Sequence, residues 1–278
     1  MTRGRSWLLA LAPALAACSL IYKSDLDDAR RPSATTPDAG PDATTPPVGV
    51  ADAGTDAAAV TGCAAYPTAK FCDDFDTQLN VADGWDKLTL SSEQTKGGFD
   101  TLAFSPSRSF KASLSGAGEC SYGRLEKTFA SAGTSRVTVS FRTRLQAPWV
   151  KDAVPFFLRL TGCGIAMGVE INATSNTSII NAQYSDGSNV LQNDVRNVDG
   201  SPVPDEWTDV TFDANAQADG HVKLDVIYDH PSGARDDKQV DLPQCRLDGK
   251  NVVIGLGYHC SQDTHDVRYD DVRVSWPT

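Results

Sequence analysis

Hydrophobic and polar residues alternate along much of residues 63–278, which is the pattern of β-strands with one buried and one solvated face. Within residues 136–145, arginine, serine and threonine alternate with apolar side chains at Val137, Val139, Phe141 and Leu145. Residues 222–228 repeat this period, with apolar side chains at Val222, Leu224, Val226 and Tyr228. Both runs predict strands that pack one face on a core.

The last run of the chain changes phase within itself. Its apolar positions are odd-numbered up to Tyr269 and even-numbered from Val272 to Trp276. Because a strand places successive side chains on opposite faces, the change at Asp270-Asp271 predicts a bulge or a kink there.

Nine further runs predict strands, and Gly, Asn, Asp and Pro punctuate the chain between them. The runs are Ala69–Phe75, Trp85–Leu90, Phe110–Leu114, Tyr122–Phe129, Val154–Leu160, Ile165–Ile171, Ser178–Tyr184, Trp207–Phe212 and Val252–Tyr258. Asp-Gly pairs, which favour tight turns, begin at Asp186, Asp199, Asp219 and Asp248. About a dozen strands without a long helical period predict an all-β, two-sheet antiparallel sandwich over residues 63–278.

The N-terminus has a different pattern. Arg3 and Arg5 precede an apolar run that ends at Ala17 and is followed by Cys18. This order is typical of a secretory signal over residues 1–17. The apolar run is shorter than the roughly 20 apolar residues of a membrane-spanning helix. An ordinary secreted protein would share this signal.

The segment Leu15-Ala16-Ala17-Cys18 resembles the lipobox of bacterial lipoproteins. The resemblance implies that Cys18 becomes the acylated N-terminus of a membrane-anchored protein, held in a bilayer by several lipid chains. Ser19, rather than aspartate, follows the anchor, which by the same resemblance favours the outer membrane.

Residues 18–62 are rich in Ala, Asp, Thr and Pro and nearly lack aromatic residues. Such a segment buries too little apolar surface to offset the entropy of ordering it, so we expect a disordered linker. It would act as a spacer between the anchor and the sandwich domain.

The formal net charge of −11 excludes nucleic acid as an expected partner, because that binding depends on Lys and Arg neutralising phosphates. Removal of a signal that carries Arg3 and Arg5 makes the mature chain more acidic still. Polyanionic substrates would need a local basic patch, for which Arg136, Arg142 and Arg144 on one strand are candidates. Alternating arginines of this kind are more often a solvated face.

Apart from Cys18 the chain has six cysteines, and an even number in an exported domain indicates disulfides. They are Cys63, Cys72, Cys120, Cys163, Cys245 and Cys260. Six cysteines allow fifteen pairings. Proximity along the chain favours Cys63–Cys72 and Cys245–Cys260, which leaves Cys120–Cys163.

Three stretches resemble the concanavalin A-like and laminin G-like jelly rolls. Phe71-Cys72-Asp73-Asp74-Phe75-Asp76 followed by Gly84-Trp85 is similar to their opening strand. Glu206–Phe212 and Gly220–Val226 are similar to a strand pair, and Tyr269–Val274 to a closing strand beside the first. The resemblance implies a jelly-roll sandwich, a fold that serves lectins, glucanases, polysaccharide lyases and adhesion modules and so leaves function open.

The resemblance also implies a structural calcium ion. Calcium takes six to eight oxygen ligands, and the carboxylates at the two ends of the domain would meet if the first and last strands pair. The candidate ligands are Asp73, Asp74, Asp76, Asp270 and Asp271. The alternative is that these residues mark strand ends and accept backbone hydrogen bonds.

Catalytic motifs are scarce. The Glu-x-Asp-x-x-Glu strand of retaining glucanases, whose two carboxylates stand about 5 Å apart, does not occur, and Glu126 and Glu170 are isolated strand carboxylates. A lyase site could be built from the four histidines together with Tyr184, Tyr228 and Tyr258. The sequence therefore favours a non-catalytic carbohydrate-binding or adhesion domain. A polysaccharide lyase or glycosidase, and a structural protein that binds an envelope protein, are the alternatives.

Glycan binding needs an aromatic face and flanking amides or carboxylates. Trp149 lies in a predicted loop, whereas Trp85, Trp207 and Trp276 fall within strands and are expected in the core. Tyr184, Asn189 and Asn193 border a polar loop that also includes Asn197. We expect Trp149, Tyr184, Asn189 and Asn193 to line a carbohydrate site.

Overall fold

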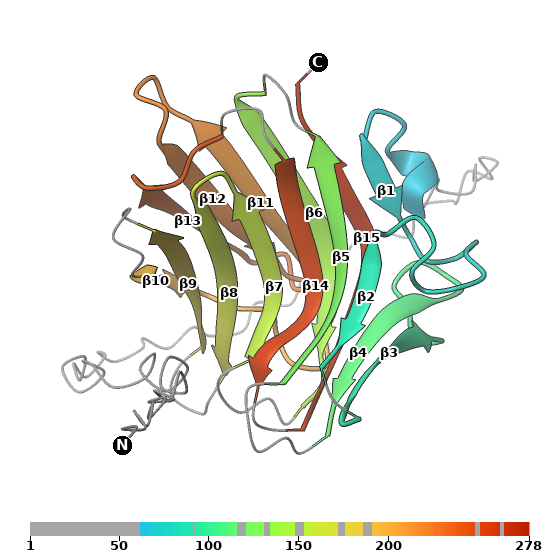
Figure 1. The fold of residues 1–278 in the computed structure, drawn as a ribbon. Helices are drawn as coiled ribbons and strands as arrows, with labels where there is room; N and C mark the ends of the chain where they lie inside the picture. Colours follow the sequence, from blue (N-terminus) through green and yellow to red (C-terminus); the bar gives the residue numbers. More distant parts are fainter. Residues whose placement is uncertain are drawn as a thin grey trace, which may run out of the picture. The chain divides into compact units, whose positions relative to one another are not determined.

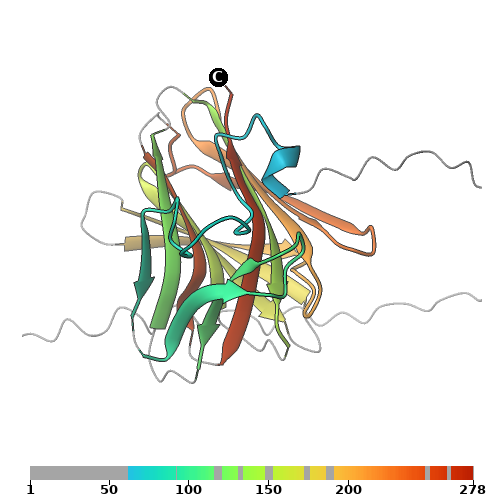
Figure 2. The same cartoon turned by 90° about the vertical axis from the view of Figure 1, so that its right-hand side faces the viewer.

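The computed structural model describes residues 62–277 except for 92, 116–120, 131–133, 148–152, 172–175, 186–190, 248–250 and 262–263. These described residues form a 3-10 turn at Gly62–Ala65 and fifteen strands in two antiparallel sheets, which lie face to face (Figures 1 and 2). The predicted all-β sandwich is confirmed.

One sheet has eight strands in the order β13-β12-β11-β6-β15-β4-β3, with β1 paired to β15. The strands are β1 Phe71–Asp73, β3 Thr95–Asp100, β4 Ser109–Leu114, β6 Arg136–Leu145, β11 Thr208–Ala216, β12 Val222–Asp229, β13 Arg235–Leu242 and β15 His265–Ser275. Pairing of β1 with β15 places the start and the end of the domain side by side, as the jelly-roll resemblance implies.

The other sheet has seven strands in the order β10-β9-β8-β7-β14-β5-β2. The strands are β2 Lys87–Leu90, β5 Ser121–Ala130, β7 Ala153–Leu160, β8 Cys163–Ile171, β9 Asn176–Ser185, β10 Leu191–Asp199 and β14 Asn251–Ser261. Its inward side chains face those of the eight-stranded sheet and complete the core.

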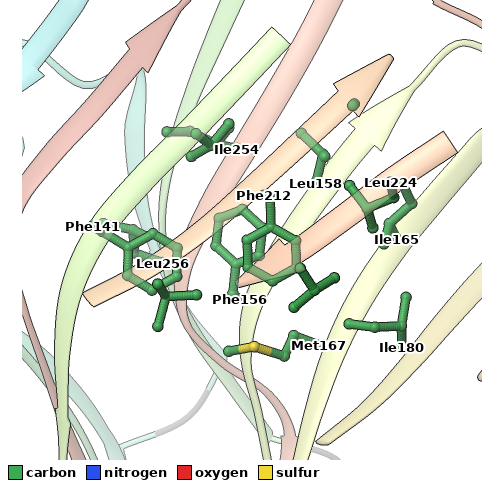
Figure 3. Close-up of a cluster of buried hydrophobic side chains, with 14 of the residues drawn as sticks. Phe141, Phe156, Leu158, Ile165, Met167, Ile180, Phe212, Leu224, Ile254 and Leu256 are labelled. Atoms are coloured by element: carbon green, nitrogen blue, oxygen red, sulfur yellow. The ribbon is translucent and has the colours of Figure 1, made fainter. Parts of the chain in front are cut away.

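Aromatic rings join the two sheets at the centre of the core (Figure 3). Phe156 of β7 stacks on Phe212 of β11 with ring centroids 4.5 Å apart and on Phe141 of β6 at 4.9 Å. All three side chains are at most 1% exposed. Burial of one such side chain contributes roughly 1.5–3 kcal/mol, so the alternating apolar positions fix which face of each strand turns inward.

The phase change in the last strand is also confirmed. The pairing of β15 with β6 shifts register between Asp270 and Arg273, and Asp271 has a positive φ of 49°. Side chains on both sides of the shift are buried, among them Tyr269 and Val272. The bulge therefore lets the strand keep apolar residues in the core through a change of parity.

Three strands, β3, β10 and β13, were not predicted. All three end the strand orders of their sheets, and few of their residues are buried. Edge strands of this kind carry polar and charged residues that blunt further pairing, so the period-two signal is weak. The prediction of a polar loop around Asn193 and Asn197 is wrong, since both residues lie on β10.

The structure confirms one predicted disulfide and corrects another. Cys63 bonds to Cys72, nine residues away. Cys163 bonds to Cys245, 82 residues away, so the predicted pairs Cys245–Cys260 and Cys120–Cys163 are wrong. The prediction paired cysteines that are close in the sequence, whereas β8 and the segment after β13 meet only in the folded sandwich.

Candidate functional site

The outer face of the seven-stranded sheet presents two rows of side chains that cross it from strand to strand. In the first row, register pairs connect Lys87 and Glu126, then Gly255, Phe157, Ala166, Asn181 and Val195. In the second row, they connect Thr128, Val253, Arg159, Gly164, Gln183 and Asn193. Strands lie about 4.8 Å apart, so seven of them carry the first row across about 29 Å.

The side chains of these rows point away from the core, as the alternation of β7 shows. Phe156, Leu158 and Leu160 are at most 3% exposed and belong to the core, whereas Phe157 is half-buried and Arg159 is exposed. Successive residues of a strand face opposite sides of the sheet. Phe157 and Arg159 therefore lie on the outer face.

A charged triad occupies the β2–β5 end of the first row. The Lys87 Nζ lies 2.8 Å from Glu126 Oε2, and the Arg124 guanidinium contacts Glu126 Oε1. Burial raises the pKa of the Glu126 carboxyl, but the hydrogen bond from Lys87 and the charges of Arg124 and Lys87 outweigh it and hold that pKa below its ordinary value. Glu126, at 6% exposure, is thus an ionised carboxylate that fixes two cations on the sheet.

Two guanidinium groups lie close to the Phe157 ring. Arg124 Cζ is 5.1 Å from the ring centroid and Arg159 Cζ is 5.4 Å from it, both within cation–π range. We call Lys87, Arg124, Glu126, Phe157 and Arg159 the outer-face cluster. Three of its four charged members are cations.

Glycines make room for these side chains to lie along the sheet. A Cβ on Gly255 would stand 2.7 Å from Arg124 Cδ, and one on Gly164 would stand 3.1 Å from Phe157 Cε2. The glycines of β14 and β8 therefore allow Arg124 and Phe157 to pack flat on neighbouring strands. Glycine within a strand is typical of a place where another group approaches the backbone closely.

The eight-stranded sheet also carries arginines on its outer face, and three of them meet carboxylates. Arg136 pairs with Asp213 at 2.5 Å, and Arg142 pairs with Asp209 at 2.9 Å and with Asp271. Arg144 lies 3.8 Å from Asp205. The basic patch considered for these three arginines is therefore neutralised.

The structure describes two of the four residues predicted to line a carbohydrate site, and it places them on opposite faces of the seven-stranded sheet. Trp149 and Asn189 lie outside the described residues. Tyr184 is half-buried and packs against the core, beside the Cys163–Cys245 bond. Asn193 is exposed and stands opposite Gln183 in the second row, so it is the member that the structure places on the outer face.

The tryptophans expected in the core differ in burial. Trp85 is 7% exposed and Trp276 packs against the core cluster. Trp207 is half-buried and instead meets Phe104 edge to face, at 6.3 Å between ring centroids.

The opening acidic residues bind protein donors. Asp73 accepts hydrogen bonds from Trp85 Nε1 at 2.5 Å, Gln78 Nε2 at 2.6 Å and the Phe75 amide at 2.8 Å. Asp74 accepts the Cys63 amide at 3.0 Å. The carboxylates of both residues are thereby occupied by N–H groups, which calcium would have to displace.

The other three acidic residues are bound in the same way. Asp76 accepts the amide of Arg108 at 2.9 Å. Asp270 accepts the amides of Phe104 and Ser105 at 2.8 and 2.9 Å, and the Ser105 hydroxyl lies 3.2 Å from Asp271 Oδ1. Among the residues described, no three His, Cys, Asp or Glu side chains are grouped to hold a metal ion. The geometry therefore does not fit the calcium site implied by the resemblance.

The acidic pair at the bulge is nevertheless unusual. Burial, and then the adjacent charge of Asp271, raise the pKa of Asp270 to about 7. Burial also raises the pKa of Asp271, which the charge of Arg142 partly opposes. Two buried carboxylates joined by one hydroxyl favour retention of a proton.

Among the histidines and tyrosines considered for a lyase site, those whose side chains the structure describes do not converge on one place. His221 lies between Asp219 and Asp241, and His230 pairs with Asp236 at 3.0 Å, all at the β12–β13 side of the eight-stranded sheet. Tyr228 is fully buried in the core. The side chains of Glu170, Tyr258 and His259 lie outside the described set.

No helix among the described residues is long and apolar enough to cross a membrane.

The structure is similar to solved polysaccharide-related β-sandwiches. The endo-β-1,4-glucuronan lyase from Trichoderma reesei is 14% identical, with a TM-score of 0.55, over 75% of this chain and 95% of the lyase. The GH16 protein of a mixed-linkage glucan locus from Bacteroides ovatus, solved with a G4G4G3G product, is 9% identical, with a TM-score of 0.50, over 74% and 99%. The domain is a jelly roll.

At these identities the likeness establishes the jelly-roll fold alone. No protein-family model and no curated protein matches the sequence.

Sequence reasoning missed most of the outer-face cluster, although β7 carries a signal for it. In Phe156-Phe157-Leu158-Arg159 the odd-numbered positions face outward, so Phe157 is an aromatic residue where the alternation calls for a polar one.

Proposed function

We propose that residues 63–278 form a carbohydrate-binding domain that holds a polysaccharide against the outer face of the seven-stranded sheet. The observation that carries this proposal is the half-buried Phe157 ring, which lies in the first row within cation–π range of the Arg124 and Arg159 guanidiniums. The apolar face of a sugar ring packs on such an aromatic surface, while its hydroxyls reach polar groups around it.

Amide side chains continue both rows away from Phe157. Asn181 lies two strands from it in the first row, and Gln183 and Asn193 form a register pair in the second. The Oδ1 atom of Asn181 is buried and has no hydrogen-bond partner among the described residues. Amides donate and accept hydrogen bonds at once, which suits the hydroxyl groups of a glycan.

A binding role agrees better with the outer-face cluster than a hydrolytic one. A retaining or inverting glycosidase needs a second carboxylate across the scissile bond from the first. Both carboxylate oxygens of Glu126 are instead bound to cations, one to Lys87 and the other to Arg124. We therefore propose that the domain binds its polysaccharide and leaves it intact.

We also propose that Cys18 anchors the domain to the cell envelope, on the outer membrane, with residues 18–62 as a spacer. The lipobox-like Leu15-Ala16-Ala17-Cys18 supports the anchor, and the Pro- and Asp-rich composition of residues 32–58 supports the spacer. Radiolabelled palmitate should enter the protein in its native host and fail to enter Cys18→Ser. Equal labelling of the two proteins would contradict the anchor.

The test of carbohydrate binding compares two phenylalanines that each lie beside an arginine. Phe104, in the loop between β3 and β4, is 49% exposed, and the guanidinium of Arg142 on β6 lies 3.6 Å from its ring centroid. In gels that contain soluble polysaccharide, Phe157→Ala should lose most of the retardation, whereas Phe104→Ala should keep it. Equal retardation of both variants would overturn the site, and polysaccharide shortened after incubation would establish catalysis.

A further inference from the structure

We infer that the polysaccharide held by the outer face is carboxylated, a uronate-containing chain rather than a neutral glucan. This inference rests on the proposed function and names the ligand class of the same site. It is drawn from the charges of the outer-face cluster, which oppose the charge of the chain as a whole.

The chain has a formal net charge of −11, yet the outer-face cluster holds Lys87, Arg124 and Arg159 against the single carboxylate of Glu126. Arg159 is exposed, and among the described residues no carboxylate pairs with it. An acidic protein that gathers cations in one place attracts an anionic ligand there and repels it elsewhere. A neutral glucan would need neither Arg124 nor Arg159.

The two guanidiniums are positioned to share one ligand. Arg124 and Arg159 lie 5.1 and 5.4 Å from the centre of the same Phe157 ring. A sugar stacked on that ring would bring a carboxylate on its edge within reach of a guanidinium fork, which binds carboxylates through paired N–H donors. Stacking and charge pairing would then act on the same sugar unit.

Lys87 extends the positive charge along the first row. Its side chain is 57% exposed on β2, and three strand spacings, or about 14 Å, separate it from β7 in the order of the sheet. A second carboxylate farther along the same polysaccharide could therefore meet Lys87. Repeated charge along the ligand is what a row of this length would recognise.

Glu126 holds this arrangement in place. Its two oxygens bind Lys87 Nζ and the Arg124 guanidinium, so both cations keep fixed positions without being fully neutralised. A guanidinium has five N–H donors, of which only those on Nε and Nη2 contact Glu126. Glu126 is thus a positioning residue, and Arg124 retains donors for a ligand.

The experiment uses matched pairs of polymers: polygalacturonate and alginate, each tested beside its own carboxyl-reduced form. Isothermal titration should show binding to the uronates that falls at least tenfold after reduction of the carboxyls and weakens as salt is raised. Equal binding of each reduced polymer would overturn the inference and leave carbohydrate binding intact. Absence of binding to uronates, reduced polymers and neutral glucans would overturn both.

Variants locate the effect. Arg159→Gln should weaken uronate binding about tenfold, and Lys238→Gln, which removes an exposed cation from β13 of the other sheet, should leave it within twofold. Because both residues are exposed, neither substitution disturbs the core. If both variants bind uronates like the parent chain, or if Lys238→Gln is the weaker of the two, the outer-face cluster does not select the ligand.

Discussion

Arg124 lies across Gly255, the residue that stands between Glu126 and Phe157 in the first row. A Cβ at that glycine would come within 2.7 Å of Arg124 Cδ, so the glycine sets where the guanidinium rests. Gly255→Ala should displace Arg124 from Phe157 and weaken polysaccharide binding about tenfold, or about 1.4 kcal/mol. Titration of the variant measures this loss.

Gly98→Ala is the matched control for that substitution. Gly98 lies on β3, and a Cβ there would have no heavy atom within 4 Å. It should bind polysaccharide like the parent chain. If the two alanine variants bind equally well, the position of Arg124 does not matter for the ligand.

The buried pair at the bulge predicts a pH dependence of stability. The folded domain raises the pKa of Asp270 to about 7 from its ordinary value of 3.8, so the folded state binds this proton more tightly than the unfolded chain does. Its contribution to stability is complete below pH 3.8 and is lost as pH rises towards 7, with a slope of at most about 1.4 kcal/mol per pH unit. Asp270→Asn should flatten this part of the profile of the free energy of unfolding.

Asp237→Asn, an exposed carboxylate of β13, serves as the control for Asp270→Asn. Urea unfolding between pH 4 and pH 8 should give the same slope for this variant as for the parent chain. A parent profile that is unaltered by Asp270→Asn would show that Asp270 is ionised throughout this range.

The two described disulfides should differ in their effect on stability. Because a crosslink restricts the unfolded chain more when it closes a longer loop, loss of Cys163–Cys245 should cost about 4.5 kcal/mol and loss of Cys63–Cys72 about 2.7 kcal/mol. Denaturant unfolding of the two double serine variants measures the order. A larger loss for the Cys63 and Cys72 pair would contradict it.

Peptide mapping without reduction tests the same pairing directly. It should recover Cys163 joined to Cys245. Of the six cysteines, Cys120 and Cys260 then remain, and they precede Ser121 and Ser261, which are register partners on β5 and β14. We predict a third bridge between them, and free thiols at these positions would contradict that prediction.

Chelation tests the acidic edge. Because the carboxylates of Asp73, Asp74 and Asp270 accept protein N–H donors, excess EDTA should leave the melting temperature unchanged. A lower melting temperature that calcium restores would return the calcium site implied by the resemblance.

The central strands could be predicted from the sequence because their apolar residues are the buried ones and alternate with polar residues. Val137, Phe141 and Leu224 are at most 1% exposed, and the phase change at Asp270-Asp271 is a register shift of β15. Edge strands such as β10 and β13 lack a clear alternation, since most of their residues are exposed or half-buried. The Cys163–Cys245 bond could not be predicted from spacing because it joins segments that only the sandwich brings together.

The candidate site was harder to predict, because it consists of residues from strands that are distant in the sequence. Lys87, Arg124 and Phe157 come to lie on one face of the sheet only through the order β7-β14-β5-β2, which no local pattern encodes. The sequence did show acidic clusters, yet the structure satisfies these within the protein. Of the predicted carbohydrate contacts, Asn193 reaches the outer face.

The proposed site places polysaccharide on the outer face of the seven-stranded sheet. Hydroxyl-radical footprinting of the intact domain, with and without saturating polygalacturonate, measures the accessibility of Phe157 and Phe104 in the same sample. Oxidation of Phe157 should fall when the polymer is bound, whereas oxidation of Phe104, in the loop between β3 and β4 of the other sheet, should not change. If the polymer protected Phe104 and left Phe157 oxidised, the ligand would lie on the opposite face, which would contradict the proposed site.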